Sequence, residues 1–111
     1  MKVYEADREK WGRSIKVNMG GDFYWLDPRP SQKMRNHSPD GFEWGYGGSG
    51  PAQLALAILL DLLGEDHQPA AQAHYQNFKD AFIAHAAKDG FRIEDAEVFA
   101  WLRDILPSPT V

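Results

Sequence analysis

The chain has 111 residues, a formal net charge of -4 and no cysteine. This length supports one hydrophobic core, so we expect a single domain over residues 1–111. An apolar share of 43% excludes an intrinsically disordered chain, and the missing cysteine excludes disulfides and thiolate chemistry.

The composition of the chain predicts its compartment, and its charge distribution predicts which partners it attracts. Because the chain lacks cysteine, a signal peptide and any apolar run of about 20 residues, we expect a cytoplasmic protein with no membrane contact. Residues 1–35 carry a net charge of +3 and residues 36–111 carry -7. The acidic part would attract basic protein patches and repel nucleic acid, although a solvated acidic face has the same composition.

Three short segments near the N-terminus are rich in β-branched and aromatic residues. They span residues 2–6, 14–18 and 22–26. Ile15 and Val17 alternate with polar neighbours, which predicts that one face of the second segment is buried. Gly20 and Gly21 suit a tight hairpin before the third. This pattern predicts an antiparallel meander of three strands over residues 2–27.

A structured loop is expected next, over residues 28–50, because this polar and Gly-rich segment also contains large aromatics. The segment 51–64 then starts with proline, is filled with strong helix formers and ends at glycine, which predicts a helix. Apolar residues occupy nearly every face of this helix, so we expect it to lie at the centre of the core.

Two further helices complete the predicted helical part, residues 51–106. The first spans residues 69–88, with an inward stripe of Ala71, Tyr75, Phe78, Phe82 and Ala86. The second starts at Glu94 or Asp95, with an inward stripe of Ala96, Phe99, Ala100, Leu102 and Ile105 or Leu106. Residues 91–93 are expected to be a short extended stretch or turn, and Pro107 begins a short tail, 107–111. The predicted fold class is therefore α+β, with the meander packed on a buried central helix and two further helices.

The glycines at 47, 48 and 50 run directly into the central helix. Exposed amides and the helix dipole would suit an anion there, although the lysine and spacing of a phosphate loop are missing. Alternatively, the glycines let the loop turn beside the buried helix, and Ser49 or Gly50 caps it. We favour this structural interpretation.

The polar residues upstream of these glycines are the other candidates for chemistry. Asn36, His37 and Asp40 can form a cluster that orients the imidazole, or simply an Asx-type turn with a hydrogen-bonded histidine. No nucleophile accompanies them, and His74 and His85 lie about three helical turns apart, too far to share a metal. No catalytic residue, metal or cofactor is therefore predicted. The candidate binding residues are Arg35, Asn36, His37, Asp40, Trp44, Tyr46, Gly48, Ser49 and Gly50.

The four tryptophans, at positions 11, 25, 44 and 101, raise the possibility of stacking on nucleic-acid bases. Large aromatics in a small α+β domain more often belong to the core or its rim, and no aromatic RNA-binding signature is present. Nucleic acid is therefore an unlikely partner.

The stretch Arg35-Asn36-His37-Ser38-Pro39, followed by Gly-Phe-Glu-Trp-Gly-Tyr-Gly-Gly-Ser-Gly-Pro-Ala-Gln-Leu-Ala-Leu-Ala over residues 41–57, resembles a family of small bacterial and phage proteins with a domain of unknown function. The flanks are also similar, at residues 26–29, 75–79 and 101–102, so the resemblance covers most of residues 2–103. It implies no activity and no catalytic residues. It does imply a setting on phages and mobile elements, where proteins that bind host factors are expected.

Together these observations predict a non-catalytic interaction protein of phage or mobile-element type. It would bind or modulate a host or phage protein or complex, with an anti-CRISPR inhibitor as one concrete version, through the aromatic loop 42–49 and the acidic helices. The alternative is a small nucleotide- or anion-binding protein or enzyme that uses residues 47–50 with Arg35 and His37. A homodimer formed through the aromatic loop is a third possibility.

Overall fold

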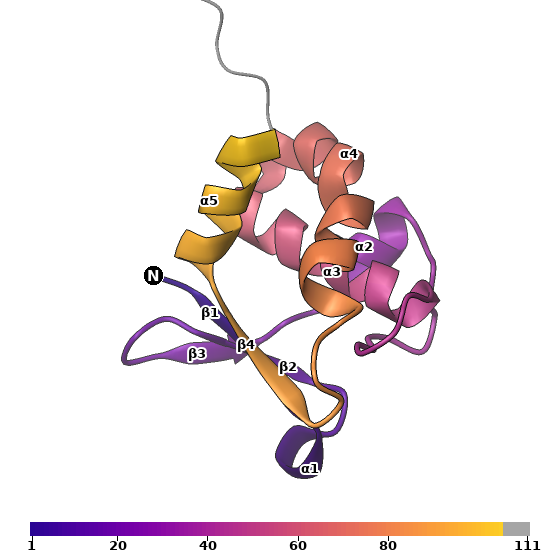
Figure 1. Ribbon diagram of the computed structural model, residues 1–111, viewed down its shortest axis with the longest axis vertical. Helices are drawn as coiled ribbons and strands as arrows, with labels where there is room; N and C mark the ends of the chain where they lie inside the picture. The colour runs from indigo at the N-terminus through magenta and orange to yellow at the C-terminus, as the bar shows by residue number, and fades with distance from the viewer. Residues whose placement is uncertain (106–111) are drawn as a thin grey trace, which may run out of the picture.

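The computed structural model describes residues 1–105 and shows a sheet covered on one face by helices (Figure 1). The four strands are antiparallel, in the order β3-β2-β1-β4. Their bounds are β1 (Val3–Asp7), β2 (Ile15–Asn18), β3 (Phe23–Trp25) and β4 (Gly90–Glu94). The predicted α+β class is confirmed, and the first three strands form the predicted meander.

The prediction of three strands is wrong by one strand. The stretch 91–93, expected to be extended or a turn, belongs to β4, which pairs with β1 and places Glu5 opposite Arg92. Gly90 opens this strand, and a Cβ at this position would overlap the carbonyl oxygen of Ala6. A side chain is therefore excluded at the closest approach of the two strands.

Five α-helices, one 3-10 turn (η1) and one π-helical turn (η2) are present in the described part of the chain. They are α1 (Arg8–Trp11), α2 (Arg29–Met34), α3 (Ser49–Leu63), η1 (Glu65–His67), α4 (Gln68–Phe78), η2 (Lys79–Ile83) and α5 (Asp95–Ile105). No helix among residues 1–105 is long and apolar enough to cross a membrane.

Two of these helices were not predicted from the sequence. The α1 helix is a single turn whose N-cap is Asp7, with the carboxylate accepting from the amide of Lys10 at 3.1 Å. The α2 helix occupies the start of the segment predicted to be a loop over 28–50. Both are short and lack an apolar stripe of their own, so hydrophobic periodicity does not reveal them.

The helix predicted over residues 69–88 ends earlier than expected. Its regular part stops at Phe78 and passes into a π-helical turn, η2, which ends at Ile83. The amide of Gly45 then donates to the carbonyl of Ile83 at 3.0 Å, and the indole N–H of Trp44 donates to the carbonyl of Ala87 at 3.1 Å. The 41–48 loop thus satisfies carbonyls that a longer helix would have used itself.

The predicted central position of α3 is confirmed. Every residue from Gly50 to Leu59 is buried, and Leu56 and Leu59 are fully enclosed. Tyr4 and Val17 from the sheet belong to the same core cluster. The helix is therefore stabilised by burial on all sides rather than by an amphipathic face.

The predicted inward stripe of α5 is wrong in part. Val98 and Leu102 are buried, whereas Ala96, Phe99 and Ile105 are exposed. Apolar residues occur on more than one side of this helix, so its sequence permits two overlapping stripes. The neighbouring helix selects one of them, through Trp101, which lies 5.7 Å from the ring of Phe78. Leu106 and the tail 107–111 lie outside the described residues.

Candidate functional site

The loop that precedes α3 is fastened to the core by Gln53, which is fully buried. Its side-chain oxygen accepts from the amides of His37 at 2.7 Å and Ser38 at 2.9 Å. Its amide nitrogen donates to the hydroxyl of Ser31 at 2.9 Å and to the carbonyl of Arg35 at 3.2 Å. All four hydrogen-bonding positions of the amide are used, so Gln53 is a structural anchor for residues 31–38.

The imidazole of His37 makes one side-chain contact, at 2.7 Å from Nε2 to the hydroxyl of Tyr75 on α4. Burial, reinforced by the positive charges of Arg35 and Lys79, lowers the pKa of His37 below its usual value. The ring is therefore neutral near pH 7. No hydrogen bond joins it to Asn36 or Asp40 among the described residues, and both of those side chains are exposed, so the predicted polar cluster does not form.

Trp44 is buried and holds the loop on a second side. The guanidinium of Arg8 lies 4.2 Å from the Trp44 ring and forms an ion pair with Glu43 at 2.7 Å. The hydrogen bond from Arg8 lowers the pKa of Glu43 against the opposing effect of burial, and raises the pKa of Arg8 itself. This group joins the start of α1 to the loop and leaves Trp44 inaccessible to a partner.

The glycines at the start of α3 serve the packing of the loop. The N-cap is Gly48 and no side chain caps the helix, so the expectation that Ser49 or Gly50 would cap it is wrong. The Tyr46 ring covers Gly48, and the side chain of Glu43 packs directly on Gly50, where a Cβ would lie 2.6 Å from that of Glu43. The stem of Glu43, whose carboxylate pairs with Arg8, therefore fills the space over the first turn where an anion would have to lie.

The predicted candidate residues thus separate into two groups. The buried ones are anchors, namely Trp44 and Gly50, with partly buried His37 and Gly48. The exposed ones are Arg35, Asn36, Asp40, Tyr46 and Ser49. Among the exposed members, only Tyr46 presents a large apolar surface, at 49% exposure.

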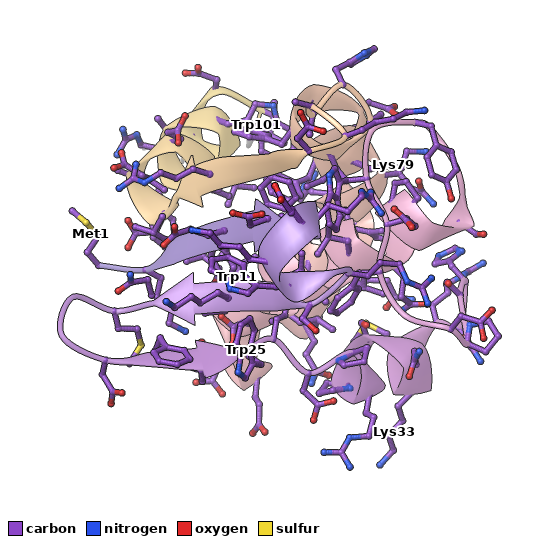
Figure 2. The ribbon with its side chains drawn as sticks, turned by 90° about the horizontal axis from the view of Figure 1, so that it is seen from below. Met1, Trp11, Trp25, Lys33, Lys79 and Trp101 are labelled. Carbon is purple, nitrogen blue, oxygen red and sulfur yellow. The ribbon has the colours of Figure 1, made fainter. Side chains whose placement is uncertain are left out.

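The sequence reasoning missed a group of aromatic side chains on the opposite side of the molecule. Trp11, Phe23 and Trp25 gather around Lys16. Figure 2 shows Trp11 and Trp25 from below, on the outer face of the sheet, where the single turn α1 also lies. We call these four residues the aromatic face. Phe23 is 49% exposed and Trp25 is 47% exposed, in a protein that encloses most of its other large apolar side chains.

The geometry of the aromatic face is specific. The Trp25 ring lies edge-on to its two neighbours, at centroid distances of 5.6 Å from Trp11 and 5.8 Å from Phe23. The ammonium of Lys16 lies 4.4 Å from the Phe23 ring centroid and 5.3 Å from that of Trp11. These edge-to-face and cation–π contacts orient the exposed rings without burying them.

A signal for this face was present in the sequence. Phe23 and Trp25 are two residues apart on a strand, so they share one face, and the register of the hairpin places Lys16 opposite Trp25. Because Ile15 and Val17 were expected to point inward, Lys16 between them and Trp25 opposite it had to point outward.

The edges of the sheet, in contrast, are guarded against pairing. The β3 strand has only three residues, and the amide of Phe23 is bonded by the side chain of Asp22 at 2.8 Å. At the other edge, β4 carries the ion pair between Arg92 and Glu94. Short strands and charged side chains discourage strand addition. The exposed aromatic rings, and not the strand edges, are therefore the part of the sheet suited to binding another molecule.

A second polar network joins the sheet to the end of α3. The carboxylate of Asp61 accepts from the hydroxyls of Tyr4 at 2.7 Å and Tyr24 at 2.8 Å, and pairs with the ammonium of Lys2 at 3.2 Å. Burial and the bond to Asp61 raise the pKa of Tyr4 well above its usual range. A cavity of about 360 Å³ opens beside this carboxylate, between β3, α2 and α3. Since both carboxylate oxygens of Asp61 and both tyrosine hydroxyls are bonded within the chain, the network is a structural cross-link.

Among the described residues, no three His, Asp or Glu side chains are grouped so that they could bind a metal ion. The comparisons with known proteins assign no chemistry either. The model of a family of unknown function, DUF6166, matches residues 4–104.

The chain belongs to this family. The resemblance inferred from the sequence is confirmed at this level, and the DUF6166 match includes both the Gln53 anchor and the aromatic face. No curated protein and no solved structure matches the chain.

Proposed function

We propose that this DUF6166 protein is a non-catalytic interaction protein and that the aromatic face is its contact surface. The observation that carries the proposal is the exposure of Phe23 and Trp25 beside Trp11 on the outer face of the sheet. Tryptophan and other large aromatics dominate the binding energy of protein interfaces, because each buries a large area with few rotatable bonds. Clustered exposed rings mark a surface that another molecule covers.

The partner we propose is a host or phage protein or complex, and inhibition of a host defence is one form this binding would take. This surface replaces the aromatic loop 42–49 as the leading contact, because Phe42 and Trp44 are buried. The nucleotide- or anion-binding alternative is weaker, since Glu43 packs at the first turn of α3.

The test compares two surfaces that are equally exposed. Tagged wild-type chain, the double variant Phe23→Ser/Trp25→Ser and the control Tyr46→Ser are incubated with host lysate, and retained proteins are identified by mass spectrometry. We expect a partner that wild type and the Tyr46 variant retain and that the double variant loses. Circular dichroism confirms that all three chains are folded.

Two results would contradict the proposal. If the double variant retains the same proteins as wild type, the aromatic face is not the contact surface. If retention is lost with Tyr46→Ser alone, the contact lies on the loop that precedes α3.

A further inference from the structure

We infer that the segment of the partner protein that occupies the aromatic face carries a carboxylate flanked by apolar side chains, and that the carboxylate contacts Lys16. This inference rests on the proposed function and deepens it, because it states the chemistry of the partner.

Lys16 is a cation without an acidic partner within residues 1–105. Its register neighbour on β1 is Glu5, yet no ion pair forms between them; Glu5 instead accepts from the side-chain amide of Asn18 at 3.4 Å. The ammonium of Lys16 turns toward the rings of Phe23 and Trp11. Cation–π contact leaves N–H groups of an ammonium available to an acceptor.

Two basic side chains near the sheet are already neutralised by the chain itself. Arg8 pairs with Glu43, and Arg92 pairs with Glu94. Lys16 differs from them because it stands among exposed aromatic rings. An approaching carboxylate would be shielded from water by those rings, and such a shielded pair is stronger than one on open surface. The basic charge of residues 1–35, which contain the whole face, has the complementary sign.

The ring geometry favours a protein segment over single-stranded nucleic acid. Bases stack on exposed ring faces, whereas Trp25 meets its two neighbours at interplanar angles of 75° and 83°. Edge-to-face rings instead leave spaces between them that aliphatic side chains can fill.

The experiment uses a random 12-residue peptide library displayed on phage. Peptides are selected on immobilised wild-type chain after removal of those that bind Phe23→Ser/Trp25→Ser. Selected peptides are synthesised and their affinities are measured by fluorescence polarisation against wild type, Lys16→Gln and the control Lys33→Gln. Lys33 is an exposed lysine on α2, at a distance from the aromatic face in Figure 2.

We expect selected peptides to carry Asp or Glu next to Leu, Ile or Phe. Their affinity should fall about tenfold or more with Lys16→Gln and stay unchanged with Lys33→Gln. Replacing the peptide's own Asp or Glu by the amide should weaken binding to wild type by a similar factor and have little effect on binding to Lys16→Gln.

The outcomes separate this inference from the proposed function. Peptides that depend on Phe23 and Trp25 but carry no acidic residue overturn the inference and leave the proposed function standing. If no selected peptide depends on these rings, both are overturned. Two control measurements test the kind of partner. Tight binding of a thymidine oligonucleotide to the wild-type chain would overturn the inference of a protein partner. A wild-type dimer in sedimentation equilibrium that Trp25→Ser converts to monomer would show that the face binds a second copy of the chain and would also overturn the inference.

Discussion

Replacement of Gln53 by leucine should be the most damaging polar-to-apolar change in the chain. Leucine preserves much of the volume but leaves the hydroxyl of Ser31, the amides of His37 and Ser38 and the carbonyl of Arg35 without their partner. At about 1 kcal/mol for each of the four hydrogen bonds, the variant should lose about 3 to 4 kcal/mol of unfolding free energy. Small domains have about 5–15 kcal/mol in total, so the loss is a large fraction.

Urea denaturation followed by tryptophan fluorescence measures this loss, and thermal unfolding should show a Tm lower by about 12–16 °C. The matched control is Gln72→Leu, an exposed glutamine on α4, which should change stability by less than about 0.5 kcal/mol. Hydrogen exchange at the amides of residues 37 and 38 provides a local readout. If the free energy of unfolding of Gln53→Leu lies within about 1 kcal/mol of the wild-type value and these amides stay protected from exchange, Gln53 is not the anchor of the loop.

Three further predictions follow from contacts between distant segments. Gly90→Ala should lower the free energy of unfolding by about 1–3 kcal/mol, because the new Cβ overlaps the carbonyl of Ala6 and separates β4 from β1. Tyr4→Phe should cost about 1–2 kcal/mol through its lost bond to Asp61, measured by urea denaturation. The lowered pKa of Glu43 contributes stability that is present above pH 4.5, its unperturbed pKa, and lost as pH falls, so Glu43→Gln should flatten the acid limb of a stability–pH curve.

Each of these variants has a matched comparison. Gly21→Ala adds a methyl group where no atom lies within 4 Å and should leave stability nearly unchanged. Tyr46→Phe removes a hydroxyl that makes no hydrogen bond among the described residues, so it should be neutral. An unaltered acid limb in Glu43→Gln would show that its pairing with Arg8 does not contribute to folding, and a stable Gly90→Ala would show that β4 can shift without loss.

The central helix and the first hairpin were predictable because their signals are local. The composition of residues 51–64 allows no amphipathic surface helix, and the structure buries α3 on all sides. The alternation of Ile15 and Val17 placed them on the inner face of the sheet, where both are fully buried. In each case, propensity and burial require the same conformation, so no tertiary information was needed.

The fourth strand and the early end of α4 were not predictable in this way. Residues 90–94 have no strong strand pattern, and they become β4 because β1, more than 80 residues earlier, offers a free edge. Likewise, the helix after Pro69 ends in a π turn, where Gly45 donates to the carbonyl of Ile83 and Trp44 donates to the carbonyl of Ala87 beyond the turn. Both outcomes depend on partners that are far away in sequence.

The candidate site shows the same division most clearly. The loop 35–51 stood out in the sequence because its composition is unusual, and the structure explains that composition by packing. Gln53 and Trp44 fasten the loop to the core by hydrogen bonds, and Gly50 leaves room for the side chain of Glu43. The aromatic face was overlooked because Trp11, Phe23 and Trp25 are individually ordinary. Only the hairpin register and the turn of α1 bring them around Lys16.

The amino-acid sequence by itself determined the α+β class, the buried helix and membership of a family of unknown function, because composition and short-range patterns encode these properties. The tertiary structure decided which aromatic residues are enclosed and which are presented to solvent. Trp44 and Trp25 are chemically identical, yet one is 1% exposed and the other 47%. The difference arises because α2 to α5 cover one face of the sheet, whereas the single turn α1 lies on the other and leaves much of it open.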